Sequence, residues 1–278
     1  MFAGRRIGIW LALPAAIFVA LTFLVPVLVL FKASLETPAG LSLGNFTAFF
    51  ADPLNQSVFW RTMRLGLIVT LICAALGYAT ALAIIGLGPR WRGAMIGLVA
   101  LPLMISPVAR TYAWVVVLGR TGIFNAALLT LGLTAEPLRI LFTETAVAVG
   151  LVQLFLPLMV LSLLPSLENL PADVVPAARM LGANWVQVFF KVILPLTRDG
   201  LVTGGTLVFT GAVTAYITPA ILGGARVLML ETLLVQRINV ANDIVTGAVI
   251  AVILVITAIA ANQVLRRLAM PARKASAR

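Results

Sequence analysis

Six long apolar runs, separated by shorter polar segments, constrain the fold of this chain more than any other feature. The runs lie approximately at residues 7–31, 65–87, 94–118, 146–164, 200–224 and 244–265. Each is close to the roughly 20 residues that a helix needs to cross the hydrocarbon core of a bilayer. Because hydrocarbon offers no hydrogen-bond partners, each run must satisfy its own backbone and is predicted to be helical. The sequence therefore predicts an all-α polytopic membrane protein with six transmembrane helices in a single domain, residues 1–278.

Composition supports this class and excludes another. Of the 278 residues, 62% are hydrophobic and only 10% are charged, whereas soluble domains carry about 25% charged residues. The formal charge of +11 could suggest a nucleic-acid-binding protein. However, the basic residues sit at the ends of the apolar runs and are not clustered on a polar domain, so no nucleic-acid partner is expected.

The first run follows Arg5 and Arg6, so a cleaved signal peptide is an alternative to a membrane span. Its apolar stretch is longer than the 7–15 residues typical of a signal peptide, and no clear A-x-A cleavage site follows it. We interpret it as a retained helix.

The distribution of positive charge predicts the orientation of the spans. An even number of spans places both termini on one side. If that side is the cytoplasm, the inner segments carry twelve basic residues and the outer segments seven, with Arg110 inside the third span. The inner residues are Arg5, Arg6, Arg90, Arg92, Arg179, Lys191, Arg198, Arg266, Arg267, Arg273, Lys274 and Arg278, and the outer ones are Lys32, Arg61, Arg64, Arg120, Arg139, Arg226 and Arg237. The positive-inside rule therefore predicts that both termini are cytoplasmic.

The sequence lacks the residues that several kinds of catalytic and metal-binding site require. The chain has no histidine, and Cys73 is its only cysteine. Catalytic imidazole and histidine-ligated metal sites are therefore excluded, and no catalytic residue or metal site is predicted. The sequence also lacks the GxxxxGK[ST] phosphate-binding loop, so the chain is not expected to hydrolyse ATP.

The connection 165–199 is the longest on the predicted cytoplasmic side, and its local signals predict a hairpin of two short helices. Pro171 suits a first helical position, and Asp173 would follow in the first turn. Gly182 is placed to end this helix in a left-handed conformation. Asn184 can cap the second helix, with Gln187 completing a capping box. On periodicity alone, a plain interfacial hairpin is the better interpretation, and the particular residues of the hairpin favour a further role.

The residues of this hairpin carry a family resemblance. The sequence Pro176-Ala177-Ala178-Arg179, followed by Gly182 and then by Ile193-Leu194-Pro195, resembles the EAA signature of ATP-binding cassette (ABC) importer permeases. In that family the loop forms a coupling helix that docks on the ATPase. The resemblance thus assigns coupling to Pro176, Ala177, Ala178, Arg179, Gly182, Ile193 and Pro195.

One residue departs from the signature. Pro176 occupies the position at which the family usually has glutamate. A proline inside a helix removes a hydrogen bond and costs about 3 kcal/mol unless the helix begins there. We therefore expect the helix to start or kink near Val175, and contacts that depend on the glutamate are in doubt.

The resemblance extends over nearly the whole chain and is to permeases of the spermidine/putrescine type. It includes residues 119–125 and 137–143, the fourth span from Val149 to Met159, Tyr216, Thr218-Pro219 and Leu222-Gly223-Gly224. It implies a methionine-importer-like (MetI-like) permease fold, with the hairpin at 165–199 as its coupling helix, in the bacterial inner membrane and in contact with membrane lipid. The implied partners are an ABC ATPase dimer, a second homologous permease in a heterodimer, and a periplasmic solute-binding protein. No cofactor is implied, since ATP is bound by the ATPase.

Arg110 is the one basic residue within a predicted span, between Pro107 and the outer end of the third run. A charge at this depth must face protein or water, which makes it a candidate for the solute pathway. The alternative is that its side chain extends to the outer interface. Both interpretations stay open.

Further polar residues near the outer mouth are candidates for the same pathway. They are Tyr112, Thr214, Tyr216 and Thr218. Aromatic residues also populate membrane interfaces without a binding role, and this alternative applies to Tyr112 and Trp114. Gly200 and Gly204 form a GxxxG pair, which predicts helix packing either within the chain or against the partner permease.

The solute class is the least constrained inference. A polyamine would favour carboxylates along its route, yet no acidic residue lies inside a predicted span. A related amine, an opine or a phosphonate stays open, and Arg110 would suit an anionic group. A secondary transporter or channel is the alternative function, but we expect neither paired intramembrane charges nor broken helices in both halves. A membrane enzyme would need histidine or clustered carboxylates, which are missing.

Overall fold

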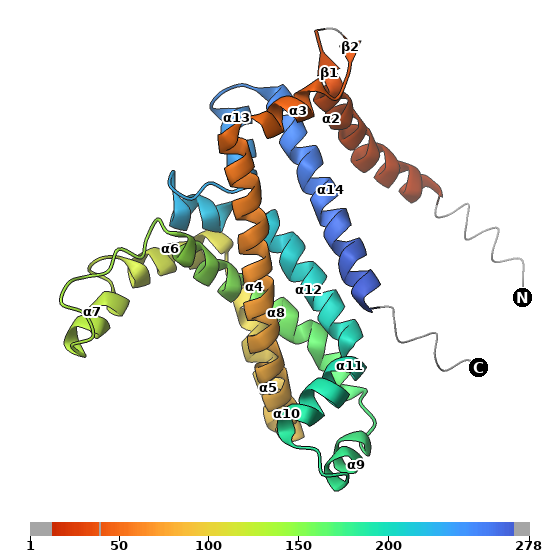
Figure 1. Cartoon of the computed structure of the whole chain (residues 1–278), viewed down its shortest axis with the longest axis vertical. Coiled ribbons are helices and arrows are strands. Elements are labelled where there is room, and N and C mark those ends of the chain that lie inside the picture. Colours follow the sequence, from red (N-terminus) through yellow and green to blue (C-terminus); the bar gives the residue numbers. More distant parts are fainter. Residues whose placement is uncertain (1–12, 39, 270–278) are drawn as a thin grey trace, which may run out of the picture. The chain divides into compact units, whose positions relative to one another are not determined.

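The computed structural model describes residues 13–38 and 40–269, and within them the chain is almost entirely helical (Figure 1). Its residues form two compact units. Unit 1 comprises the chain up to Ser57 together with Leu233–Val255, and unit 2 comprises Val58–Thr232 together with the residues from Ile256. The first part of the first predicted span lies outside the described residues. The basic residues before position 13 and after position 269 lie outside them as well.

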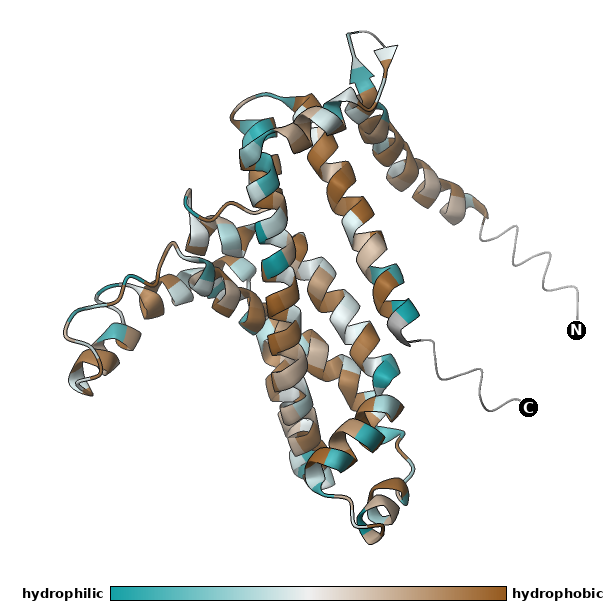
Figure 2. Ribbon diagram, viewed as in Figure 1, coloured by the Kyte–Doolittle hydropathy of each residue, from teal (hydrophilic) through white to brown (hydrophobic). Residues whose placement is uncertain are grey.

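The first unit contains the first helices of the described chain and parts of its last two helices. A helix covers Leu13–Leu35, with a π-helical stretch η1 (Ala20–Leu24) before α2 (Val25–Leu35). A two-stranded antiparallel ribbon, β1 (Glu36–Thr37) and β2 (Gly40–Leu41), leads to α3 (Gly44–Ala51). Most of α13 (Leu230–Asn239) and the first half of α14 (Ile244–Ala269) complete this unit. Figure 2 shows that apolar residues run along α2 and α14, as expected for surfaces in hydrocarbon.

The second unit is built around α8 (Glu144–Glu168), which is continuous although it contains Pro157 and Pro165. The preceding elements are α4 (Pro53–Ile85), α5 (Pro89–Ala100), the 3-10 turn η2 (Leu101–Met104), α6 (Pro107–Leu118) and α7 (Ile123–Thr130). The following elements are α9 (Val174–Met180), α10 (Trp185–Val188), η3 (Phe189–Ile193), α11 (Leu194–Leu196), α12 (Arg198–Val213) and η4 (Pro219–Gly223).

Glycines bring α12 directly against α8. A β-carbon at Gly200 would lie 2.8 Å from the backbone oxygen of Ser162, and one at Gly204 would lie 2.7 Å from Sδ of Met159. A β-carbon at Gly211 would lie 2.4 Å from the ring of Phe155. The GxxxG pair predicted from the sequence therefore packs inside this chain, because only glycine permits so close an approach of the two helices.

One helix, α4, is longer than the apolar run that predicted it, and a polar cap at its first turn explains the difference. The second run was predicted at 65–87, whereas α4 begins twelve residues earlier, at Pro53. The side chain of Asp52 accepts a hydrogen bond from the backbone N–H of Leu54 at 2.8 Å, and Pro53 has no N–H to lose. This start signal is polar and therefore does not register in a hydropathy pattern.

The third and fifth predicted spans are not continuous helices, so the expectation that broken helices would not occur in both halves of the chain is wrong, because the fifth span is interrupted as well as the third. The helix of the third run stops before Ile105 and Ser106, which are extended with ψ of 136° and 129° because Pro107 follows. The fifth run is helical to Val213, is non-helical at residues 214–216, and resumes before Pro219, whose ring prevents the bond of a regular turn. Both interruptions lie in unit 2.

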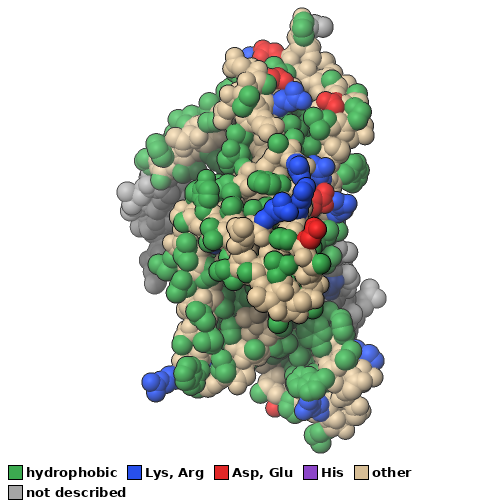
Figure 3. Space-filling model, turned by 90° about the vertical axis from the view of Figure 1, so that its left-hand side faces the viewer, with side chains coloured by type: hydrophobic (Ala, Val, Ile, Leu, Met, Phe, Trp, Pro, Cys, Tyr) green, Lys and Arg blue, Asp and Glu red, His purple; other side chains and the backbone are tan. Residues whose placement is uncertain are grey.

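Within the described residues, five helices are long and apolar enough to cross a membrane, and a sixth is obtained if the bent pair Trp185–Leu196 and Arg198–Val213 counts as one span. The two members of this pair meet at an angle of 76°. In the space-filling view, hydrophobic side chains cover much of the surface and charged ones gather in a few places (Figure 3). Such a surface fits a chain that spends most of its length in lipid.

Candidate functional site

The hairpin after α8 is shaped by two helix caps that the sequence predicts. The second helix begins with the predicted capping box, in which Asn184 Oδ1 accepts from the N–H of Gln187 at 2.8 Å and Gln187 Oε1 accepts from the N–H of Asn184 at 3.0 Å. The first helix ends at Gly182, which has the predicted left-handed backbone with φ of +83°.

The end of α9 is a Schellman motif. The N–H of Gly182 donates to the carbonyl of Arg179 at 2.9 Å, and the N–H of Ala183 donates to that of Ala178 at 3.1 Å. These two bonds satisfy carbonyls that would otherwise be left free at the helix end. The turn is therefore fixed by its backbone, and only the conformation of Gly182 makes it possible.

The first helix begins later than predicted. It starts at Val174, with Asp173 as the flanking residue, and Pro171 lies outside it. Pro176 is thus the third helical residue, where an amide N–H would have no partner within the helix in any case. The missing N–H of Pro176 costs little there, as the expected start near Val175 implied.

The tip of the hairpin carries exposed apolar side chains. Met180 and Leu181 are each 89% exposed, and Trp185 and Val186 on the second helix are more than 60% exposed. The guanidinium of Arg179 lies 4.2 Å from the ring centre of Trp185 and joins the two helices across the turn. An exposed apolar cluster of this kind, next to a cation, is typical of a protein-protein contact surface.

The predicted coupling residues divide into two groups. Pro176, Ala177, Arg179, Gly182 and Pro195 are exposed in this chain. Ala178 is half-buried and Ile193 is only 4% exposed, so both face the rest of unit 2. The hairpin therefore presents one face to the surroundings and anchors itself with the other.

The anchor lies at the bend between α11 and α12. Thr197 is fully buried there, and its hydroxyl donates to the carbonyl of Ile193 at 2.8 Å. The hydroxyl of Tyr78 on α4 then donates to Thr197 Oγ1 at 2.9 Å, and the ring of Tyr78 packs edge-on against Phe189 with 5.3 Å between centroids. These contacts join the end of the hairpin to α4 and to the start of α12. Sequence patterns did not single out either Tyr78 or Thr197.

A second link ties the neighbourhood of the hairpin to the third span. Arg92 on α5 forms an ion pair with Glu168, the last residue of α8. Two further arginines of α4, Arg61 and Arg64, pair with Glu144 at the opposite end of α8. Arg61 also donates to the carbonyl of Leu228 at 3.3 Å. Ion pairs thus hold both ends of α8. The sequence located these charged residues at the edges of spans but did not predict how they pair.

Arg110 is buried, with 9% of its surface exposed, and its guanidinium donates to the carbonyl of Pro102 at 2.9 Å. That carbonyl belongs to the interrupted turn η2. The contact bridges the break in the third span and holds the Arg110 side chain against the protein. It does not extend outward to the interface.

The other predicted pathway residues are not all together. Thr218 is 4% exposed and contacts α6, where its hydroxyl lies 3.3 Å from that of Thr111. Tyr112, Thr214 and Tyr216 are exposed, beside the same two helix interruptions. Thr111 was not recognised in the sequence, and its position in an apolar run gave no signal that it would contact a second threonine.

An apolar groove lies between α4 and α8, with a volume of about 640 Å³. Its few polar wall residues are Glu144, Thr145 and Gln153, and Trp114 closes one side. The indole N–H of Trp114 donates to Gln153 Oε1 at 3.4 Å. A polar pair at this depth in an apolar wall is uncommon and was not foreseen from the sequence.

Comparison with known proteins agrees with this geometry. A family profile described as binding-protein-dependent transport system inner membrane component matches residues 82–270. The spermidine/putrescine transport system permease protein PotB of Haemophilus influenzae is 36% identical over 247 residues, covering 86% of each chain. PotB of Escherichia coli is 35% identical and covers 77% of this chain and 78% of its own.

Solved structures give the same fold at lower identity. A subunit of a bacterial alginate ABC transporter, in complex with an alginate-bound periplasmic protein, superposes with a TM-score of 0.78 over 97% of this chain and 98% of its own, at 15% identity. A chain of the inward-facing MetNI methionine ABC transporter gives a TM-score of 0.56 over 76% of this chain and 92% of its own, at 17% identity.

Proposed function

Because the chain belongs to the family of binding-protein-dependent transport system inner membrane components, we propose that it forms half of the passage for a polyamine or a related small organic amine. The observation that supports a polyamine as the solute is the 36% identity, over 86% of the chain, with a spermidine/putrescine permease. Opines and phosphonates are the less favoured classes, since they have no such support.

Family membership defines the role of the chain in the machine. It is the multi-pass permease subunit of an ABC importer in the inner membrane. It has no catalytic part of its own, and ATP is bound by a partner ATPase. A periplasmic solute-binding protein delivers the solute.

The hairpin is proposed as the element that docks on the ATPase. Support comes from its exposed apolar tip at Met180, Leu181 and Trp185, from its rigid turn, and from its anchor at Tyr78 and Thr197. Docked helices act as levers: closure of the ATPase pair would shift the hairpin, and the bend at Thr197 would pass this shift on to α12 and α4. Pro176, Ala177, Arg179 and Gly182 are the surface part of this device.

The solute pathway is proposed to run beside the interruptions in the third and fifth spans. Irregular backbone at membrane depth is tolerated where it lines a cavity or is covered by protein. Tyr112, Thr214 and Tyr216 lie exposed beside these interruptions. Arg110 and Thr218 then serve to hold the broken backbone in place, which is supported by their bonds to Pro102 and Thr111.

Two finer points of assembly belong to the same proposal. Both termini face the cytoplasm, as the excess of basic residues on the proposed inner segments supports. The second permease of the pair is a different chain, because this one contributes no carboxylate inside its spans for a polycation and a non-identical partner can supply it.

Uptake of labelled solutes tests the solute class. Cells that lack their own polyamine importers would receive this chain with its natural partners, and uptake of putrescine, spermidine, an opine and a phosphonate would be measured. We expect ATP-dependent uptake of a polyamine that stops when the ATPase is omitted. Uptake of only an anionic solute would reject the proposed class.

A further inference from the structure

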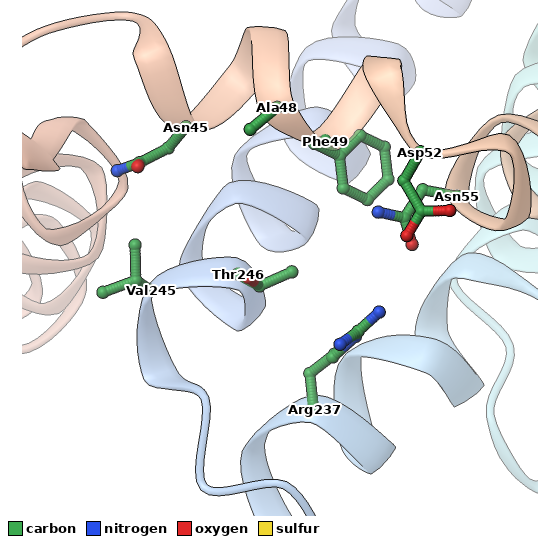
Figure 4. Close-up of a pocket in the computed structure, with 8 residues that line it drawn as sticks. All are labelled: Asn45, Ala48, Phe49, Asp52, Asn55, Arg237, Val245 and Thr246. Carbon is green, nitrogen blue, oxygen red and sulfur yellow. The ribbon is translucent and has the colours of Figure 1, made fainter.

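Unit 1 contains a polar pocket that neither the coupling role nor the solute pathway uses (Figure 4). Its volume is about 230 Å³, which is roughly the space of eight water molecules at about 30 Å³ each. The walls come from α3, from the corner between α3 and α4, and from α13 and α14. The lining residues are Asn45, Ala48, Phe49, Asp52, Asn55, Arg237, Val245 and Thr246.

Asn55 is the feature that marks this pocket as a site. It is only 4% exposed, and its amide oxygen has no hydrogen-bond partner among the described residues. A buried acceptor without a partner is costly, so native structures rarely keep one unless a ligand, ion or water completes it. Figure 4 shows the amide of Asn55 directed into the pocket beside Asp52.

The walls around Asn55 are held in place before any ligand arrives. One oxygen of Asp52 accepts the N–H of Leu54 at 2.8 Å, which orients its carboxylate. The amide of Asn45 donates to the carbonyls of Ser34 and Glu36 at 3.0 and 2.9 Å. The backbone N–H of Thr246 is bound by Asp243 at 3.0 Å. A pocket fixed in this way loses little entropy when it binds.

The charges of the pocket are of both signs and stand on opposite walls. Figure 4 shows the guanidinium of Arg237, on α13, pointing across the pocket toward Asp52 and Asn55. The two charged groups do not form an ion pair with each other, since no nitrogen and oxygen of theirs come within 4.0 Å. The space between them suits a molecule that carries a donor cation at one end and an anion at the other.

We propose that this pocket binds a small zwitterion of the amino-acid class. Its ammonium group donates to the carboxylate of Asp52 and to the amide oxygen of Asn55, and its carboxylate accepts from Arg237. A diamine would meet the guanidinium with a like charge, and a simple carboxylate would leave Asn55 without a donor. The site therefore discriminates against the proposed cargo and lies beyond the transport function itself. Residues 32–64 are proposed to face the periplasm, so the ligand arrives from that side.

The test is ligand binding to the purified complex of permease and ATPase subunits in lipid nanodiscs, without the soluble binding protein. Glycine, β-alanine and 4-aminobutyrate are titrated by calorimetry, with putrescine and butyrate as single-charge-sign probes. We expect the best of the zwitterions to bind at least about tenfold more tightly than either probe and to raise the thermal midpoint of the complex.

Three variants make the result specific. Asn55→Leu removes the unpartnered acceptor, and Arg237→Gln removes the cation from a half-buried position at which it forms no ion pair within the described residues. Each should weaken zwitterion binding by at least about tenfold. Asn239→Leu, an exposed residue of the same helix outside the pocket, is the matched control and should bind like the parent.

Two outcomes would overturn the proposal. One is that no zwitterion binds the intact complex up to about 10 mM. The other is that putrescine binds as well as the zwitterions and that Arg237→Gln leaves their affinity unchanged. Polyamine uptake is measured separately, so either outcome leaves the proposed transport function standing or falling on its own assay.

Discussion

Gly182 determines the turn of the hairpin between α9 and α10 through its backbone conformation alone. A β-carbon at this position would meet no atom within 4 Å, so a substitution has space and suffers only from the left-handed φ of +83°. That conformation costs a non-glycine residue about 1–2 kcal/mol, and less for asparagine. The turn is therefore sensitive to the type of residue and not to its size.

We predict that Gly182→Leu uncouples ATP hydrolysis from uptake, whereas Gly182→Asn keeps most of the coupling. The reason is that leucine destabilises the left-handed turn and asparagine tolerates it. The ratio of solute transported to ATP hydrolysed, measured in proteoliposomes at matched abundance, checks this. Normal coupling in Gly182→Leu would show that the turn is not part of the lever.

At Tyr78, a single hydrogen bond to Thr197 connects α4 to the bend before α12. Tyr78→Phe keeps the ring contact with Phe189 and removes only the hydrogen bond to Thr197. We expect a loss of about 0.5–1.5 kcal/mol in stability, the usual value of one such bond, together with a lower transport-to-hydrolysis ratio. An unchanged ratio with lowered stability would assign Tyr78 to folding only. Thr80→Val, which removes a hydroxyl that donates to the carbonyl of Leu76 within the same helix, is the control.

At the scale of elements, the close packing of α8 and α12 depends on particular glycines. Gly200→Ala would place a methyl 2.8 Å from a backbone oxygen of α8, which cannot rotate away. In contrast, Gly205→Ala would meet only a methyl of Thr70 at 3.8 Å. We expect the first to lower stability by about 1–3 kcal/mol and the second to be neutral or slightly stabilising.

The only cysteine of the chain provides the readout for this pair of variants. Cys73 is fully buried, so a thiol-reactive dye reports when unfolding exposes it. Thermal curves of Gly200→Ala and Gly205→Ala in detergent can then be compared with the parent. Equal midpoints for all three would contradict the assignment of Gly200 to the helix interface.

The elements that sequence could predict were those governed by local rules. The helical state of the apolar runs follows from the lack of partners in lipid, and the capping box at Asn184 and the turn at Gly182 follow from adjacent residues. Pro102 and Pro107 indicated the interruption of the third span, whereas the interruption at Tyr216 was missed although Pro219 stands near it, because membrane helices often tolerate proline, as α8 does at Pro157.

The contacts between elements could not be predicted in this way. Tyr78 and Thr197 are 119 residues apart, and Arg61 and Glu144 are 83 apart. Their pairing depends on how helices pack, which no local pattern encodes. The same holds for Asn55, whose unpartnered amide is visible only once the walls of the pocket are in place.

At the scale of the whole molecule, the chain is one part of an importer. Its membrane spans carry no ATP site, and its hairpin exposes apolar residues that have no partner within the described part of the chain. Both facts are explained if the energy for transport enters through the hairpin from a separate ATPase. We therefore expect the hairpin tip to contact that ATPase directly.

A cross-link at the hairpin tip tests this contact most directly. Met180→Cys places a thiol at a position that is 89% exposed, and the buried Cys73 gives little background. The affinity-tagged variant, purified from membranes that contain its natural partners, would be treated with a short bifunctional thiol reagent. We predict a cross-linked product that contains the ATPase and is lost when ATPase subunits are removed. Val240→Cys is the control, because the proposed topology places it on the opposite side of the membrane. If the ATPase co-purifies but Met180→Cys gives no more cross-linked product than Val240→Cys, the hairpin is not the docking element.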